Sequence, residues 1–319
     1  MTPEQRKKAS IDLTLTYLNS YYPDWRLAKV LTIEKLLAER YSFYNDLVSD
    51  IKQFDDESGE ATIAQEIKNG LYFDAISNCV QYIEDLFALI NASKNSDFFI
   101  RDIVTFKAGN VTNLIRNFKI TSKTVSDVFH FPPELQFEST ENQVAYETAV
   151  NYLANLVDDI TLFHKDYEYF YTQFKHGLSV AMRPFGNKYS EEQITKDKKN
   201  DFEPYLKVYD NRRLSTALRK GTLKTNDAVL MTGFTENVRP FVGDLSNENN
   251  FLRLVQTEHL NLKIDTLLDV AYKTRLCVKL FIFNYSHKIK PNNGQRQFQL
   301  PLDYRESRVL TCNYSHQEH

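Results

Sequence analysis

One short segment brings together side chains that could carry out acid–base chemistry. Tyr169, Gln173 and His176 follow one another at steps of four and three residues, so a helix would place them on one face, with Lys175 beside it. A histidine next to a lysine could deprotonate an attacking hydroxyl group and stabilise the developing negative charge without a metal ion. In the structural alternative, Lys175 and His176 bind the last carbonyl groups of their helix.

A second polar stripe occurs earlier in the chain. Asp74, Asn78, Gln81 and Asp85 recur at helical spacing, with Glu84 one step away, and the other side of the segment is apolar. If this stripe faces the first one across a helical bundle, the two form one pocket. Glu84 then joins the candidate catalytic residues. The alternative is a stripe exposed to solvent.

Basic residues concentrate further along the chain, interleaved with aromatic ones. A local patch of this kind could hold the phosphates of a nucleic acid. The candidate nucleic-acid-binding residues are Arg183, Lys188, Lys198, Lys199, Arg212 and Arg213. Acidic residues in the same region dilute the positive charge, so a solvated loop is the alternative.

Other familiar signatures of catalysis are absent from the sequence. It contains no phosphate-binding GxxxxGK[ST] loop, GxGxxG turn, HExxH, CxxC pair or GxSxG elbow. Its 7 histidines never pair at i and i+4, so no metal site or cofactor is expected. Two acidic pairs remain: Asp158 with Asp159, and Asp265 with Asp269. The second pair could share a metal with Glu258, although such pairs are much more often a solvated face of a helix.

The composition is that of a globular protein. Of the 319 residues, 42% are hydrophobic and 25% charged, with 22 phenylalanines and 19 tyrosines to build a core. The formal charge of −3 argues against a protein dedicated to coating nucleic acid. Three widely spaced cysteines argue against a disulfide framework, and neither a signal peptide nor a membrane span is visible. We therefore expect a soluble, cytoplasmic protein without membrane contact.

The elements that must position these residues are mostly helices. Apolar residues recur at three- and four-residue steps, which predicts helices over 3–22, 24–51, 61–93, 97–118 and 140–182, with a short element at 122–129. Asp97 and Thr140 are the predicted N-caps of the last two long helices, Thr140 in a capping box with Gln143.

The C-terminal part has a different character. Strand-like pieces are predicted at 205–209, 228–232, 238–242 and 297–302, a helix that is apolar almost all round at 249–285, and a frayed tail at 305–319. The predicted fold is mainly α, a multi-helix bundle with a small β-rich insertion near the C-terminal third. Its predicted parts are the bundle (1–187), a polar loop with the β-rich insertion (188–245), a long helix that packs back on the bundle (246–288), and an edge strand and tail (289–319).

The segment ending in Lys175-His176-Gly177, expected to face the earlier helix with Gln81 and Glu84, resembles bacterial HEPN-type helical bundles over roughly residues 60–185. Those families include abortive-infection and toxin–antitoxin proteins. In their ribonuclease members an arginine a few residues before a histidine carries RNA cleavage, usually across a dimer. Here Tyr169, Phe170 and Tyr171 stand where that arginine would be. The resemblance therefore carries over only Lys175 and His176, with Gln173 where the pattern often has asparagine.

Two functional hypotheses follow. The first is a non-catalytic, HEPN-like interaction module, homodimeric, that binds a protein or RNA partner in phage defence or a toxin–antitoxin setting. The missing arginine and the absence of other catalytic signatures favour it. The second is a metal-independent RNA endonuclease that uses Lys175 and His176.

Overall fold

The computed structural model describes residues 2–39, 41–44, 60–94, 96–133, 135, 137, 139–176, 180–181, 207–210, 256–259, 262–291 and 295–315. The chain divides into two compact units, each assembled from segments that are far apart in the sequence. The first unit consists of Met1–Thr32, Ala75–Glu168 and Ile264–His319. The second consists of Ile33–Asp74 and Tyr169–Lys263.

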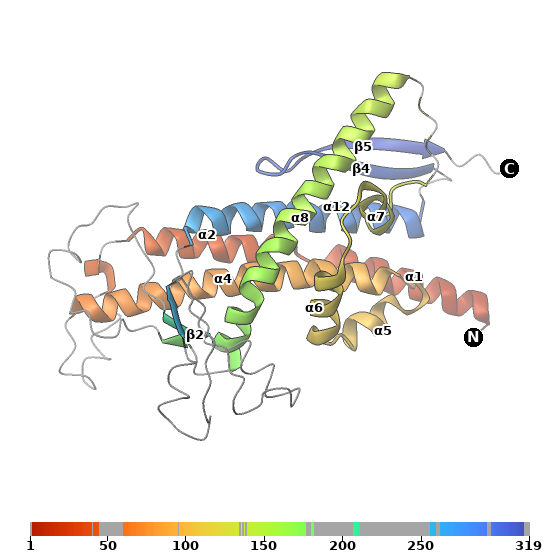
Figure 1. The fold of residues 1–319 in the computed structure, drawn as a ribbon. Helices are drawn as coiled ribbons and strands as arrows, with labels where there is room; N and C mark the ends of the chain where they lie inside the picture. The colour runs from red at the N-terminus through yellow and green to blue at the C-terminus, as the bar shows by residue number, and fades with distance from the viewer. Residues whose placement is uncertain are drawn as a thin grey trace, which may run out of the picture. The chain divides into compact units, whose positions relative to one another are not determined.

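Helices dominate the described residues, as the sequence predicts, and a two-stranded antiparallel sheet lies near the C-terminal end (Figure 1). The α-helices are α1 (Pro3–Ser20), α2 (Trp25–Leu37), α4 (Glu60–Ser93), α5 (Phe99–Val104), α6 (Ala108–Asn117), α7 (Ser122–Val128), α8 (Thr140–His176) and α12 (Ile264–Ile289). Two 3-10 helices are η1 (Tyr41–Tyr44) and η2 (Ser96–Phe98). The strands are β1 (Val180–Ala181), β2 (Lys207–Asp210), β3 (Gln256–His259), β4 (Gln295–Asp303) and β5 (Arg308–Ser315).

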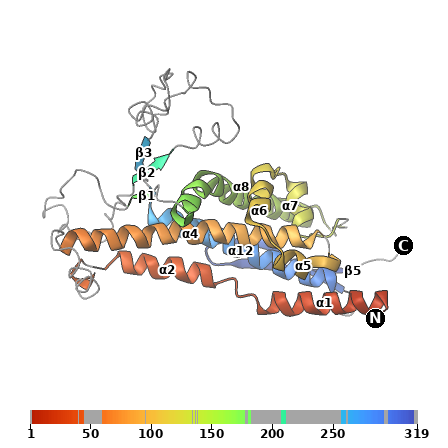
Figure 2. The same cartoon turned by 90° about the horizontal axis from the view of Figure 1, so that it is seen from below.

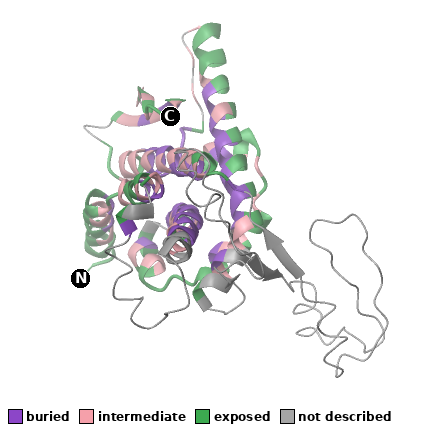
Figure 3. Cartoon of the chain, turned by 90° about the vertical axis from the view of Figure 1, so that its left-hand side faces the viewer, coloured by how far each residue is buried: buried purple, intermediate pink, exposed green. Residues whose placement is uncertain are grey.

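The core of the first unit lies between residues 75–93 of α4, residues 140–168 of α8, and α12 (Figure 2). This part of α8 is buried along one stripe and exposed along the other, as an amphipathic helix requires (Figure 3). By contrast, α12 is buried from Leu267 to Tyr285 on most of its circumference. The all-round apolar pattern of its sequence predicts this burial. Each large apolar side chain buried here contributes about 1.5–3 kcal/mol to stability.

A buried asparagine fixes the C-terminal hairpin to α12. Strands β4 and β5 pair antiparallel, and β4 lies along α12 (Figure 1). The side chain of Asn284, fully buried in α12, donates to the carbonyl of Gln299 at 3.2 Å and accepts from its amide at 2.7 Å. Both backbone groups of Gln299 are therefore satisfied by the helix, as buried polar groups must be. The sequence predicts the strand at 297–302 correctly, but it does not predict that this strand packs against α12 through Asn284.

The second unit contains a three-stranded antiparallel sheet in the order β1-β2-β3 and a tertiary cap on α2. The buried Lys68 of α4 donates to the carbonyls of Leu37 at 3.2 Å and Glu39 at 2.6 Å. The hydroxyl of Tyr44 donates to the carbonyl of Leu36 at 2.5 Å. These bonds satisfy carbonyls that a helix leaves free at its C-terminus.

The same contacts explain why the predicted helix at 24–51 is wrong beyond Leu37. The chain leaves the helix at Ala38, and η1 follows at Tyr41–Tyr44, while residues 45–51 lie outside the described part. The apolar periodicity continues past Leu37, but Lys68 and Tyr44 supply competing partners for the last carbonyls. The periodicity of apolar residues gives no information about side chains from other segments that bind the end of a helix.

Four further boundaries differ from the prediction. The helix expected at 97–118 is split into α5 and α6, where the hydroxyl of Thr105 bonds back to Arg101. The long C-terminal helix begins at Ile264, because Gln256–His259 pair with β2 as a strand. The expected helix over 140–182 ends at His176, since Val180–Ala181 pair with β2. The tail is not frayed over Arg308–Ser315, which complete the hairpin with β4.

Both predicted N-caps are also wrong. α8 is capped by Ser139, whose hydroxyl accepts from the amide of Asn142 at 3.2 Å, one residue before the predicted Thr140. α5 starts after Phe98 without a side-chain cap, so Asp97 does not take that role. Of the predicted strands, 205–209 corresponds to β2, and those at 228–232 and 238–242 lie outside the described residues.

Candidate functional site

The C-terminal end of α8 carries the residues predicted for acid–base chemistry. Lys175 is exposed, and its Nζ lies 3.5 Å from the hydroxyl of the buried Tyr171, one turn earlier. The side chains of Gln173 and His176 lie outside the described part of the structure. The pairing of Lys175 with His176 therefore stays a prediction.

Glu84 contacts a different histidine. Its Oε1 lies 3.6 Å from Nε2 of His164, whose side chain is fully buried. His164 precedes His176 by about three turns of α8. Neither ring nitrogen of His164 makes a hydrogen bond with the described residues, although Nε2 lies within ion-pair distance of the Glu84 carboxylate. The apolar pattern of α8 gives no signal for this contact.

The rest of the polar stripe on α4 binds an arginine. Arg26 donates from Nε and Nη2 to the two carboxylate oxygens of Asp85, at 2.5 and 3.2 Å, and from Nη1 to Gln81 at 2.6 Å. Tyr21 adds a hydrogen bond to the same carboxylate. Burial raises the pKa of Asp85, although Arg26 opposes that shift. These contacts hold α2 against α4 and engage both carboxylate oxygens of Asp85.

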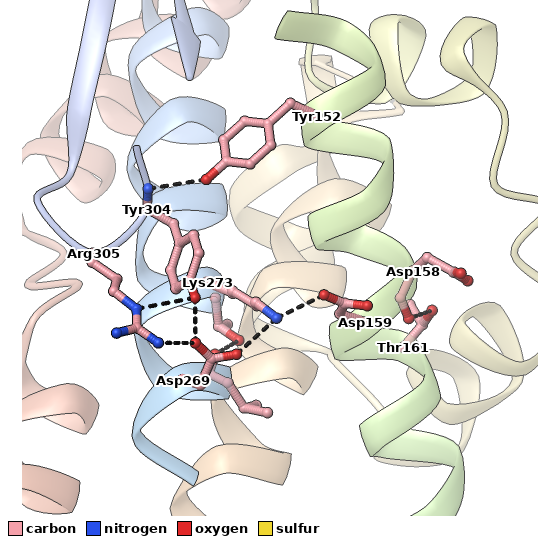
Figure 4. Close-up of polar contacts among 10 residues, drawn as sticks. Tyr152, Asp158, Asp159, Thr161, Asp269, Lys273, Tyr304 and Arg305 are labelled. Carbon is pink, nitrogen blue, oxygen red and sulfur yellow. Dashed lines mark hydrogen bonds and ion pairs between the residues drawn. The ribbon is translucent and has the colours of Figure 1, made fainter. Parts of the chain in front are cut away.

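The candidate nucleic-acid-binding residues Arg183, Lys188, Lys198, Lys199, Arg212 and Arg213 lie outside the described residues. The acidic pairs, in contrast, fall in the described part. Asp159 of α8 and Asp269 of α12 approach each other across Lys273, whose Nζ is 2.7 Å from a carboxylate oxygen of each (Figure 4). The sequence analysis pairs acidic residues that are close together in the chain, and so it does not predict that Asp159 and Asp269 share Lys273.

This Lys273 cluster also includes the turn between β4 and β5. The hydroxyl of Tyr304 donates to Asp269, Arg305 lies 3.5 Å from the same carboxylate, and the amide of Tyr304 donates to Tyr152 of α8 (Figure 4). Burial alone would lower the pKa of Lys273, but its two carboxylate partners outweigh it, and the pKa is raised. Lys273 is therefore a permanent cation between two carboxylates, which suits a structural clasp and not a nucleophile.

A third cluster surrounds His130, which the sequence analysis does not single out. His130 follows α7 with φ 58°, the left-handed region that favours glycine. The amide of Phe131 donates to the carbonyl of Ser126, and the amide of His130 donates to the carbonyl of Asp127. These two hydrogen bonds define a Schellman C-cap. Holding a non-glycine residue there costs about 1–2 kcal/mol. The imidazole must therefore be positioned by contacts that offset this cost.

Those contacts come from three other elements. Nε2 of His130 lies 3.1 Å from the hydroxyl of Ser93 in α4, and Nδ1 lies 3.1 Å from Nζ of Lys288 in α12. The ring packs on Tyr285, with centroids 4.8 Å apart, and Arg296 of β4 donates to its backbone carbonyl. Burial, together with the charges of Lys288 and Arg296, lowers the pKa of His130 to about 3. The ring is therefore neutral at physiological pH, with Nδ1 accepting from Lys288.

Two searches of the described residues give negative results. They contain no group of three or more His, Cys, Asp or Glu side chains placed to hold a metal ion. No helix in this part of the chain is both long and apolar enough to span a bilayer. Comparison with known proteins finds no matching family model, curated protein or solved structure.

Proposed function

We propose that this chain is a cytoplasmic, HEPN-like binding module, homodimeric, that recognises an RNA or protein partner in phage defence or a toxin–antitoxin setting. The observation that supports it is that acidic side chains of the helices contact basic side chains of the same chain. Glu84 lies against His164, Asp85 is held by Arg26, and Asp269 is held by Lys273. Side chains already held by partners in this way are suited to support and not to proton transfer with a substrate.

The second candidate is a metal-independent RNA endonuclease. What favours it is the exposure of Lys175, adjacent to His176 in the last turn of α8. There an exposed cation could stabilise the negative charge that develops when a ribose hydroxyl attacks the neighbouring phosphate. His176 would accept the proton of that hydroxyl.

One experiment separates the two candidates. The wild type, His176→Ala and Lys175→Ala are incubated with labelled single-stranded RNA and with tRNA in EDTA. Lys165→Ala is the matched control, because Lys165 is an exposed lysine on the same helix. The binding module predicts no cleavage by any of the four proteins. Cleavage that is lost in His176→Ala and Lys175→Ala but kept in Lys165→Ala would instead establish the nuclease.

Binding is measured in the same samples by fluorescence anisotropy at increasing salt. If RNA is the partner, the logarithm of the binding constant falls linearly with the logarithm of the salt concentration. Replacing Arg212 and Arg213 with glutamine then reduces that slope, by about one for each phosphate contact removed. An unchanged slope would exclude these two residues from the interface.

A further inference from the structure

Two cations converge on His130 without a carboxylate between them. Lys288 lies in the last turn of α12; the residue is exposed overall, but its Nζ forms a partly buried contact, 3.1 Å from Nδ1 of His130. Arg296 lies on β4, is half-buried, and donates from Nη2 to the carbonyl of the same histidine. Among the described residues, neither cation forms an ion pair.

Three other cations of the same unit do have carboxylate partners. Lys290, two positions after Lys288, lies 3.8 Å from Asp12. Arg275, on the same helix, lies 2.5 Å from Asp24, and Lys273 binds Asp159 and Asp269. The cluster formed by His130, Lys288 and Arg296 differs from these three cations in that its charges have no carboxylate partner among the described residues.

The folded chain bears a cost for this arrangement. Burial and the charge of Arg296 lower the pKa of Lys288, and burial lowers the pKa of Arg296. The Nε of Arg296 is enclosed and makes no hydrogen bond within the described residues. Partly desolvated cations without a counter-ion are destabilising, and an anion bound between them would offset that cost.

The donors that remain also fit one kind of ligand. One N–H of Lys288 points to His130, which leaves two for a ligand, and the guanidinium of Arg296 keeps N–H groups beyond the one given to the carbonyl. His130 is neutral and fixed by Ser93, so it aims the ammonium group without adding charge. Two cations at one corner suit a phosphate group, which carries one negative charge in a phosphodiester and nearly two as inorganic phosphate near neutral pH.

We propose that His130, Lys288 and Arg296 form an oxyanion site that binds a phosphate group. Lys288 and Arg296 contact the phosphate oxygens, and His130 is a positioning residue that holds Lys288. The site lies wholly within the first unit and includes neither Lys175 nor His176, so it goes beyond the proposed function. The phosphate is either free or part of an oligonucleotide, and the experiment distinguishes these two sources.

The test is calorimetric titration of the full chain with inorganic phosphate, and separately with a short single-stranded RNA that lacks a terminal phosphate. Ionic strength is held constant with chloride. We expect saturable binding of at least one probe, weakened about tenfold or more in Lys288→Gln and in Arg296→Gln. Lys290→Gln is the matched control, with the same charge removed from a lysine that already has a partner, and it should bind as the wild type does.

Arg296→Lys guards against misfolding as the cause of lost binding. It keeps the charge but not the fork of donors, so it should retain measurable binding that Arg296→Gln loses. Binding of phosphate alone assigns a free ligand, and binding of the oligonucleotide with the same dependence on Lys288 assigns a backbone phosphate. If neither probe binds, or if Lys288→Gln binds as tightly as Lys290→Gln, the site does not exist. Phosphate binding does not require RNA recognition, so it can succeed where the proposed function fails.

Discussion

Two lysines on the same helix have opposite surroundings. Lys273 lies between two carboxylates, and its positive charge is matched within the Lys273 cluster. Lys288, four turns later, faces a neutral imidazole and a guanidinium. The first arrangement is complete within the chain and serves to hold α8, α12 and the hairpin together. The second is incomplete without an anion, which is why only the second suggests a ligand.

The largest expected difference between the His130 cluster and the Lys273 cluster is in how stability depends on pH. The pKa of His130 is about 3 in the folded protein and about 6.5 when unfolded, so the folded state binds fewer protons between these values. The neutral His130 side chain therefore makes its full contribution to stability above pH 6.5, and this contribution is lost as the pH falls. We expect a loss of about 2 kcal/mol between pH 7 and pH 5, measured by urea unfolding.

His130→Asn removes this titration and suits the left-handed backbone, because asparagine tolerates positive φ. Its stability should change less between pH 7 and pH 5 than that of the wild type. Equal slopes in the wild type and in His130→Asn would show that His130 titrates normally.

The next effect is the loss of the matched charge. Lys273→Gln removes the cation between the carboxylates of Asp159 and Asp269, and the two negative charges then repel each other. Because Asp159 is half exposed, solvent screens part of this cost, and we expect a loss of about 1.5 kcal/mol in the free energy of unfolding. Denaturant unfolding at pH 7 measures it. A loss below the experimental error would contradict the role of the Lys273 cluster as a clasp.

The same substitution at the second lysine should act differently. Lys288→Gln keeps an N–H donor for His130 but removes the repulsion with Arg296. In buffer without phosphate we expect no loss of stability, and a gain of up to about 0.5 kcal/mol. A loss as large as that of Lys273→Gln would mean that Lys288 has an anionic partner within the chain.

The smallest effect lies at the edge of the Lys273 cluster. Arg305 is mostly exposed, and its guanidinium is 3.5 Å from a carboxylate that Lys273 already holds. Arg305→Gln should leave the unfolding midpoint unchanged within error, because exposed ion pairs are screened by water and salt. A clear shift of the unfolding midpoint would show that Arg305 stabilises the Lys273 cluster as Lys273 does.

Much of the helical architecture follows from the sequence, whereas several ends of helices do not. The recurrence of apolar residues locates α1, α4 and α8, because that period reflects which side of a helix is buried. It misplaces the end of α2 by more than three turns, since Lys68 and Tyr44 bind the carbonyls there. It also misses the strand β5, whose polar residues are held by backbone pairing with β4.

The candidate sites divide in the same way. Asp269 and Asp85 were visible as members of acidic patterns, but their partners, Lys273 and Arg26, come from positions that the pattern does not relate to them. His130 carried no signal at all. Its neighbours Ser93, Lys288 and Arg296 come from three different segments of the chain.

The sequence is therefore sufficient to predict that this protein is mainly helical, with a long buried helix near its C-terminal end and a strand beyond it. These are properties of local periodicity, which depends on residues a few positions apart. The folded structure is needed to show which charged groups are neutralised and which are not. Charge matching depends on distances of a few ångströms between residues far apart in the chain, and two lysines in one helix can therefore have opposite roles.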